Sequence, residues 1–333
     1  MRAHCSFLAL SLVGLLAPLV LGLNLITPVM NRFESGDFLT VQEGRVRAYA
    51  QTLDQPKALF IGGSSTFMSI DPGVYAAALG RPVVNYGLSV NSGAEYIAKQ
   101  AGDLIRPGDL VVFAAEFVFF GAGALPSPDQ SANIQKRMAR LLPPPPWWDM
   151  SRATAHSGKL LAQMENPVRA VMHQSVGGLH HPLQPRQSHY EPFLLTAQGW
   201  LPHTRPGRFE DKRFVWHARP NASEVKIVKS PGGRALELLV RVCAERSATL
   251  AVMPPARVVK PENRHDIVQD IERDWLNHAR ELGAVVLLES GATTLDLEFG
   301  FDSDYHMNDA GAEIIRQRLV PVLRRTLAEI KYQ

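Results

Sequence analysis

Short apolar runs alternate with amphipathic segments along most of the chain. Five apolar runs, bounded by glycine, proline or polar residues, are predicted to be strands: 57–63, 82–89, 110–121, 248–256 and 284–289. The segments with helical spacing are 41–53, 74–80, 93–109, 232–247, 266–283 and 308–330. Strands that alternate with helices in this way pair in parallel, with helices covering the sheet. The pattern therefore predicts an α/β fold with a parallel sheet.

The middle of the chain breaks this pattern. Residues from about 121 to 223 are rich in proline, histidine, glutamine and arginine, and the stretch "LLPPPPWWDM" excludes a regular helix. Loops of this length are commonly functional or disordered. We interpret the region as a long insertion that decorates the sheet. Residues 34–333 are then one α/β domain with an insertion at about 121–223.

The N-terminus is strongly apolar. The run from Phe7 to Val29 contains no charged residue and is long enough to cross a bilayer as a helix, which needs roughly 20 residues. The short segment before the run has one positively charged residue, Arg2, and no A-x-A-like cleavage signal ends the run. We therefore expect residues 1–33 to be an uncleaved membrane anchor and the rest to be extracytoplasmic, which means periplasmic in a Gram-negative cell. The alternative is a cleaved signal and a secreted protein.

Composition narrows the classes of function. The chain has 333 residues, a net charge of +3 and 46% hydrophobic content, which is typical of a folded globular protein. Its lysines and arginines form no basic tract, so we expect no nucleic-acid partner. Cys5 lies in or before the apolar run and Cys243 in a predicted helix, so they are not expected to meet. No metal site and no cofactor are expected.

A glycine–serine turn follows the first predicted strand, in "ALFIGGSSTFMSIDP" (58–72). Ligands of open parallel sheets bind beyond the carboxyl ends of the strands, where this turn lies. Near the other end of the chain, "GFDSDYHMNDAG" (300–311) places His306 shortly after Asp302 and Asp304. A serine nucleophile needs a base, and the base needs an acceptor that fixes its tautomer. The two motifs together predict a Ser-His-Asp site; the alternatives are a helix-capping serine and an exposed loop histidine.

In the order of these parts, the chain resembles the SGNH/GDSL hydrolase superfamily. The first sequence block of that family is an apolar strand followed by G-x-S, which here is "IGGS" (61–64). The second block has a glycine after the second strand, which here is Gly87 in "NYGLS". The last block has an aspartate shortly before a histidine, which here is "DSDYH" (302–306). "GGSS…IDP" followed by "NYG" is also similar to membrane-anchored envelope members, which include the D-alanyl-lipoteichoic acid transfer and alginate O-acetylation proteins. The resemblance covers roughly residues 56–120 and 230–330, and it implies a flavodoxin-like three-layer α/β/α fold.

The resemblance implies a nucleophile and an oxyanion hole. Ser64 matches the nucleophile, with Ser65 as the alternative, because each follows a glycine at a suitable spacing. The hole is expected to use the backbone N–H groups of Ser64 and Gly87, or a residue from the insertion. The third block of the family commonly offers an asparagine to this hole, whereas Glu116 stands near that position here and is no donor when ionised. A slow or specialised enzyme is consistent with this difference.

His306 matches the general base of the family. The family usually has its aspartate three residues before the histidine, and that position here is Ser303. Asp302 stands one residue too early and Asp304 one too late. We expect Asp302 to orient His306, with Asp304 as the alternative.

The function that the resemblance implies is an extracytoplasmic serine esterase or O-acyltransferase. It would act through an acyl-serine on acyl, in particular acetyl, esters of cell-envelope polysaccharide. The implied partners are a carbohydrate or acyl-ester substrate, the membrane through the N-terminal helix, and a membrane-bound acyltransferase as a candidate. The alternative is a catalytically weak binding or scaffold subunit of an envelope polysaccharide acylation or export complex.

Overall fold

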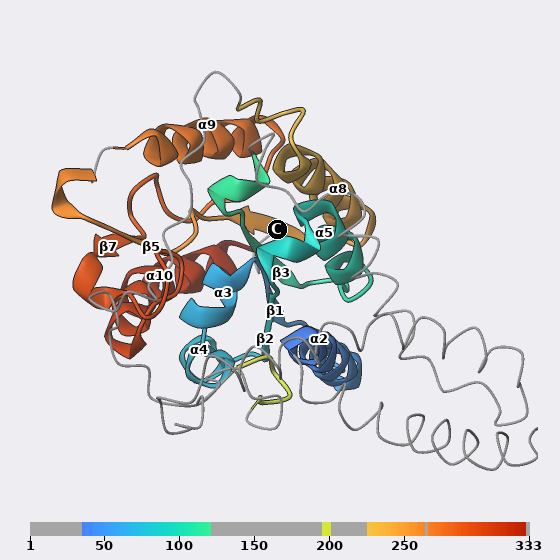
Figure 1. Cartoon of the computed structure of the whole chain (residues 1–333). Coiled ribbons are helices and arrows are strands. Elements are labelled where there is room, and N and C mark those ends of the chain that lie inside the picture. Colours follow the sequence, from blue (N-terminus) through green and yellow to red (C-terminus); the bar gives the residue numbers. More distant parts are fainter. Residues whose placement is uncertain (1–34, 121–194, 201–224, 264–265, 331–333) are drawn as a thin grey trace, which may run out of the picture. The chain divides into compact units, whose positions relative to one another are not determined.

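The computed structural model describes residues 35–120, 195–200, 225–263 and 266–330 (Figure 1). The chain divides into two compact units, and apart from the start of the first helix these residues belong to the unit that spans Leu39–Gln135 and Pro192–Gln333. No helix among them is both long and apolar enough to cross a membrane. The predicted anchor and nearly all of the predicted insertion, 121–223, lie outside the described residues.

Five strands form a parallel sheet in the order β2-β1-β3-β4-β6, which confirms the predicted α/β class. Their bounds are β1 Ala58–Gly62, β2 Val83–Gly87, β3 Leu110–Ala114, β4 Thr249–Val252 and β6 Val285–Val286. The strand order reverses beside β1, as in doubly wound sheets, whose ligands bind at the carboxyl ends of the strands near that reversal. Gly62 is paired with Gly87 on one side and with Ala114 on the other, so these three strands end at one level.

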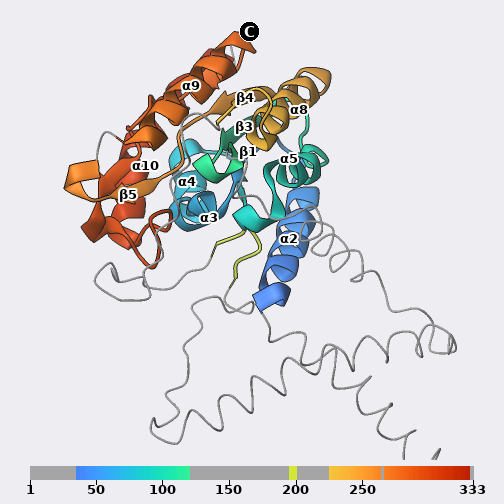
Figure 2. The ribbon, with the colours of Figure 1, turned by 45° about the horizontal axis from the view of Figure 1, so that its top comes forward.

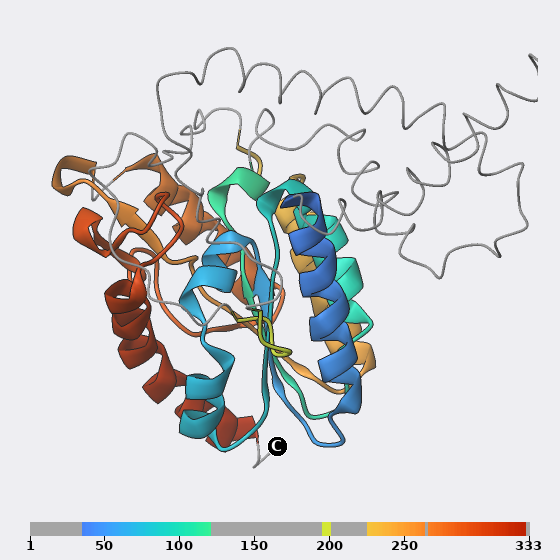
Figure 3. The ribbon, with the colours of Figure 1, turned by 60° about the horizontal axis from the view of Figure 1, so that its bottom comes forward.

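Helices cover both faces of the sheet, as Figures 2 and 3 show. One layer contains α2 (Ser35–Thr52), α5 (Ala94–Gly102), α8 (Pro231–Glu245) and α9 (Ile267–Glu281). The other contains α3 (Ser64–Ser69), α4 (Pro72–Leu79) and α10 (Asp309–Ile330). Leu59 and Ile61 of β1 pack into the first layer, and Ala58 and Phe60 into the second. Because both faces are covered, the strand is apolar throughout, as its sequence run predicts.

The sequence pattern did not predict a second parallel sheet, which β5 (Arg257–Val259) and β7 (Thr294–Asp296) form. Its residues belong to a separate small core that contains Ala256, Val258, Leu295, Met307 and Ile315. Strands this short give almost no periodic signal, because alternation becomes visible only over about four residues or more. The small sheet follows β4 in the chain and carries part of the candidate site.

All five strands are shorter than the runs predicted for them, and β3, β4 and β6 have less than half of the predicted length. β3 ends at Ala114 because its partner β1 ends at the paired Gly62. β4 ends at Val252, shortly before Pro254 and Pro255, which lack the N–H group that a ladder needs. β6, which pairs with the end of β4, is therefore short as well. The 3-10 helices of the described part are η1 (Val90–Ser92), η2 (Phe117–Phe119), η5 (Pro261–Asn263) and η6 (Leu297–Phe299).

Candidate active site

The turn between β1 and α3 contains glycines because its surroundings leave no space for side chains. A Cβ atom at Gly62 would lie 2.7 Å from the carbonyl oxygen of Ala114, and one at Gly63 would lie 2.3 Å from Oε1 of Glu116. Ser64 follows directly as the first residue of α3. The turn therefore holds Ser64 close to the carboxyl ends of β1 and β3.

The two candidate serines have different surroundings. The Ser65 side chain is buried; its hydroxyl donates to the carbonyl oxygen of Ala256 at 2.7 Å, and its N–H group donates to Oε1 of Glu116 at 2.7 Å. Ser64 is half-buried, and its hydroxyl has no hydrogen-bond partner among the described residues. The Ser65 hydroxyl already donates its hydrogen bond to a buried carbonyl oxygen. The geometry therefore favours Ser64 as the serine whose hydroxyl is available to a base.

Asp302 and His306 are paired in the loop before α10. Nδ1 of His306 lies 2.6 Å from Oδ1 of Asp302, and the two side chains are 15% and 28% exposed, respectively. The loop folds back on itself: the Phe301 N–H group donates to the carbonyl oxygen of His306 at 2.8 Å, and the His306 N–H group donates to that of Ser303 at 3.2 Å. A carboxylate beside Nδ1 favours the tautomer with its proton there, which leaves Nε2 as the proton acceptor.

The other residues of this loop hold it in place. Asp304 is fully buried, and its carbonyl oxygen accepts a hydrogen bond from the Val258 N–H group at 2.8 Å. Ser303, at the usual aspartate position of the resembled family, is buried and accepts the Tyr305 N–H group at its Oγ. The ring of Tyr305 packs against that of Phe117 in η2, with centroids 5.5 Å apart. These contacts hold the loop in the conformation in which Asp302, four residues before His306, contacts the His306 ring.

One short stretch, residues 256–258, contacts both halves of the candidate site. The carbonyl oxygen of Ala256 accepts the Ser65 hydroxyl, and two residues later the Val258 N–H group donates to the carbonyl oxygen of Asp304. The serine turn and the histidine loop, which are far apart in sequence, are thereby bound to the same segment beyond the carboxyl end of β4.

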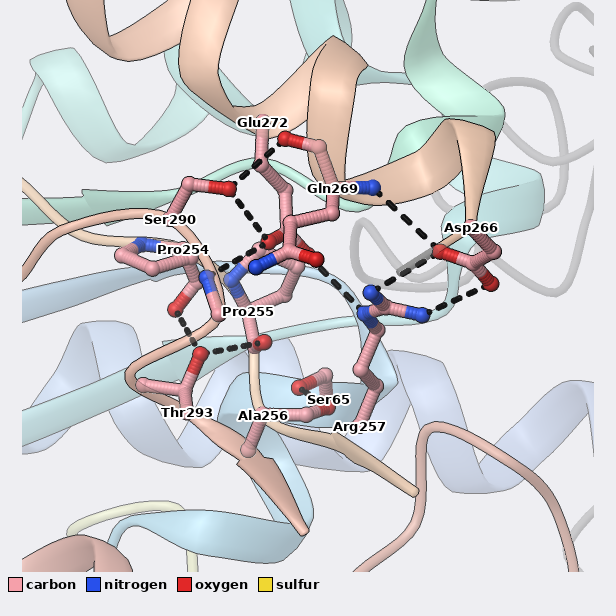
Figure 4. A network of polar contacts seen from close by, with 11 residues as sticks. Ser65, Pro254, Pro255, Ala256, Arg257, Asp266, Gln269, Glu272, Ser290 and Thr293 are labelled. Carbon is pink, nitrogen blue, oxygen red and sulfur yellow. Dashed lines mark hydrogen bonds and ion pairs between the residues drawn. The ribbon is translucent and has the colours of Figure 1, made fainter. Parts of the chain in front are cut away.

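Figure 4 shows a buried polar network that fixes this stretch. Arg257 is fully buried; its Nε lies 3.1 Å from Oε1 of Glu272, and its Nη2 lies 3.0 Å from Oδ1 of Asp266. Burial raises the pKa of Glu272, and the charge of Arg257 opposes that rise. The Thr293 hydroxyl donates to the carbonyl oxygen of Pro255 at 2.9 Å. These residues are not predicted from the sequence, because no motif links positions so widely spaced.

The two backbone donors predicted for an oxyanion hole differ in availability. The Gly87 N–H group donates to Oδ1 of Asn85 at 2.9 Å. A Cβ atom at Gly87 would lie 2.3 Å from the backbone nitrogen of Phe67, so this glycine allows β2 to pack closely against α3. The Ser64 N–H group has no hydrogen-bond partner within the described ranges. Of the two predicted donors, that of Ser64 is the one open to a ligand.

Comparisons with protein-family models, curated proteins and solved structures gave no match. In the described part of the chain, no group of three or more His, Cys, Asp or Glu side chains is placed to hold a metal ion. A functional assignment therefore depends on the chemistry of the serine turn and the histidine loop.

Proposed function

We propose that the protein is an extracytoplasmic serine esterase or O-acyltransferase of the SGNH/GDSL type. One observation carries the proposal: an Asp302–His306 pair, with 2.6 Å between Oδ1 and Nδ1, is bound through residues 256–258 to the turn that presents Ser64. The strand order β2-β1-β3-β4-β6 supports the flavodoxin-like three-layer fold that the resemblance implies.

In the first step, Oγ of Ser64 attacks the carbonyl carbon of an acyl ester while Nε2 of His306 takes the hydroxyl proton. Asp302 accepts the Nδ1–H group and stabilises the imidazolium that forms. The Ser64 N–H group donates to the developing oxyanion. His306 then gives its proton to the leaving alcohol oxygen as the ester C–O bond breaks, and an acyl-serine remains.

In the second step, His306 takes a proton from the acceptor that attacks the acyl-serine. Water as the acceptor releases a carboxylic acid, which is esterase activity. A sugar hydroxyl as the acceptor forms a new ester, which is O-acyl transfer. In both cases His306 returns the proton to Oγ of Ser64, so the site is regenerated without a cofactor.

The proposed substrate is an acyl ester, in particular an acetyl ester, of cell-envelope polysaccharide. The uncharged run from Phe7 to Val29 supports a membrane-anchored protein outside the cytoplasm. A membrane-bound acyltransferase is the candidate partner, because it would supply acyl groups from the membrane to a site of this kind.

Hydrolysis of p-nitrophenyl acetate by the full-length protein in detergent tests this proposal. His306→Ala should lower kcat/KM by about 10²–10⁴-fold, which is the usual contribution of a general acid–base residue. His278→Ala is the matched control, since His278 lies on α9 outside the candidate site. Equal activity of wild type and His306→Ala, with both above the uncatalysed rate, would contradict the proposed mechanism.

The second candidate function is a catalytically weak binding or scaffold subunit. The observation that favours it is the fully buried Glu116, whose carboxylate lies beside the serine turn where a neutral donor would better serve an oxyanion. This candidate predicts polysaccharide binding that Ser64→Ala and His306→Ala leave unchanged, together with no acyl-enzyme.

A further inference from the structure

A hollow of about 460 Å³ lies at the amino ends of β1 and β2, at the opposite end of the strands from the serine turn. This volume is within the usual range of small-molecule sites. Here α4 packs against the last turns of α10, as Figure 3 shows. The hollow is lined by two arginines and an apolar wall: Arg81, Arg324, Pro56, Leu79, Leu327 and Ala328.

The guanidinium group of Arg81 has donors without acceptors. Its Nη1 atom is buried and has no hydrogen-bond partner in the described part of the chain. Burial lowers the pKa of Arg81, and the charge of Asp109 opposes this fall. The Asp109 carboxylate, however, accepts hydrogen bonds from the Nζ and N–H groups of Lys57 and from the N–H group of Arg106. Asp109 is therefore committed to these donors, and the buried Arg81 donor is unfavourable until an acceptor is bound.

Arg324 is positioned by the end of α4. Its Nε donates to the carbonyl oxygen of Ala78, in the last turn of α4, at 2.8 Å. Neither Nη atom of Arg324 has a hydrogen-bond partner within the described ranges. The carbonyl groups at the C-terminus of a helix carry partial negative charge and repel anions. The bond from Arg324 satisfies one of these carbonyls and leaves the Nη donors for a ligand.

The charge of the hollow favours a dianion. The described residues that line it include two guanidinium groups and no acidic side chain. Guanidinium groups bind phosphate oxygens through pairs of N–H donors, and two of them match the charge of a phosphate monoester. Leu79 and Leu327 add apolar surface to the same hollow, which suits the carbon skeleton of an organic ligand.

We propose that this hollow binds an organic phosphate monoester, with the phosphate held by Arg81 and Arg324 and the carbon skeleton against Leu79 and Leu327. A soluble sugar or polyol phosphate and the headgroup of a phospholipid share this chemistry. The five residues of β1, which span about 16 Å, separate the hollow from the serine turn. The site is thus distinct from the proposed active site and does not rest on the proposed function.

Isothermal titration calorimetry of the full-length protein in a nonionic detergent tests this inference. The probes are glycerol 3-phosphate, as a soluble ester, and dioctanoyl phosphatidic acid carried in the same micelles. We expect saturable binding of at least one probe. Arg81→Gln and Arg324→Gln should each raise its Kd about 10–100-fold, because each removes charge-assisted hydrogen bonds.

Arg325→Gln is the matched control. It makes the same charge change at an exposed neighbour of Arg324 on α10 that does not line the hollow, so the Kd should stay nearly unchanged. Arg81→Lys keeps the charge but loses the planar fork, so its affinity should lie between those of the wild type and Arg81→Gln. If Arg81→Gln does not fold, Arg324→Gln decides, because its side chain is exposed.

The two probes also separate the sources of the ligand. Binding of the lipid alone identifies a headgroup, and binding of glycerol 3-phosphate identifies a soluble ester; both support the site. No saturable binding of either probe would overturn the inference. Equal affinities of the wild type, Arg81→Gln and Arg324→Gln would overturn it as well, as would an equal loss in Arg325→Gln. Esterase activity of the same samples is measured separately, and its absence counts against the proposed function alone.

Discussion

The Glu116 carboxylate accepts a hydrogen bond from the Ser65 N–H group at 2.7 Å, at the turn that presents Ser64. The N-cap residue of α3 is Gly63, which has no side chain to accept this bond. Glu116 therefore supplies, from the end of β3, the acceptor that a capping side chain would normally provide. A negative charge at the N-terminus of a helix is also favoured by the helix dipole.

Removal of this carboxylate should destabilise the turn. Glu116→Ala leaves the buried Ser65 N–H group without its acceptor, which should cost about 1–3 kcal/mol in the free energy of unfolding. Glu116→Gln keeps an acceptor oxygen and should cost less. Urea unfolding of both variants measures the difference. Unfolding midpoints equal to that of the wild type in both variants would show that Glu116 does not hold the turn.

The pairing of His306 with Asp302 predicts unequal roles for the two nearby aspartates. Asp302→Asn should lower kcat for p-nitrophenyl acetate by roughly 10³–10⁴-fold with little change in KM, because His306 loses the acceptor that fixes its tautomer. Asp304→Asn is the control: its carboxylate is fully buried, so the expected effect is on stability. A large loss of kcat in Asp304→Asn, with Asp302→Asn near wild type, would reverse the assignment.

The buried network around Arg257 should contribute strongly to stability. Arg257→Ala leaves Glu272 and Asp266 without their cation and should cost about 3–5 kcal/mol in the free energy of unfolding. Arg273→Ala, which removes an exposed pair with Asp270, should leave the unfolding midpoint nearly unchanged. Similar losses in both variants would contradict a special role for the buried network.

Cys243 should be protected from thiol reagents by the fold. Burial raises the pKa of its thiol from its ordinary value of 9.0 to about 12. Because the folded-state pKa is the higher one, this group favours the folded state below pH 9 and loses that contribution as the pH rises from 9 to 12. In Cys5→Ser, iodoacetamide at pH 8 should modify the native protein far more slowly than the urea-unfolded protein. Equal rates in the two states would show that Cys243 is accessible.

The main sheet and its helices could be predicted from the sequence because each element carries a strong local signal. The fully apolar residues of β1 and β3 and the 3.6-residue periodicity of α9 are visible in the sequence without any partner. The ends of β3 and β4 were not predictable in this way, since β3 stops where its neighbour stops and β4 stops before two prolines. The small sheet of β5 and β7 is too short to leave a periodic pattern.

For the candidate site, the types of the residues could be predicted from the sequence, but the contacts between them could not. The order of Ser64 and His306 along the chain indicates the chemistry, but the contacts that separate Ser64 from Ser65 involve Ala256, which lies 191 residues later. The choice of Asp302 likewise depends on a loop that is held through Asp304 to β5. Such contacts depend on tertiary packing, so they cannot be predicted from local sequence patterns.

Whether Ser64 is the nucleophile is tested most directly by labelling the full-length protein with a fluorophosphonate probe, followed by mass spectrometry of the labelled peptide. The probe phosphonylates a serine that a base activates: Oγ attacks the phosphorus and fluoride leaves. We predict a label on Ser64 that is lost in Ser64→Ala and retained in Ser65→Ala, with both variants folded. Labelling of Ser64→Ala at the wild-type level would contradict the assignment of Ser64 as the nucleophile.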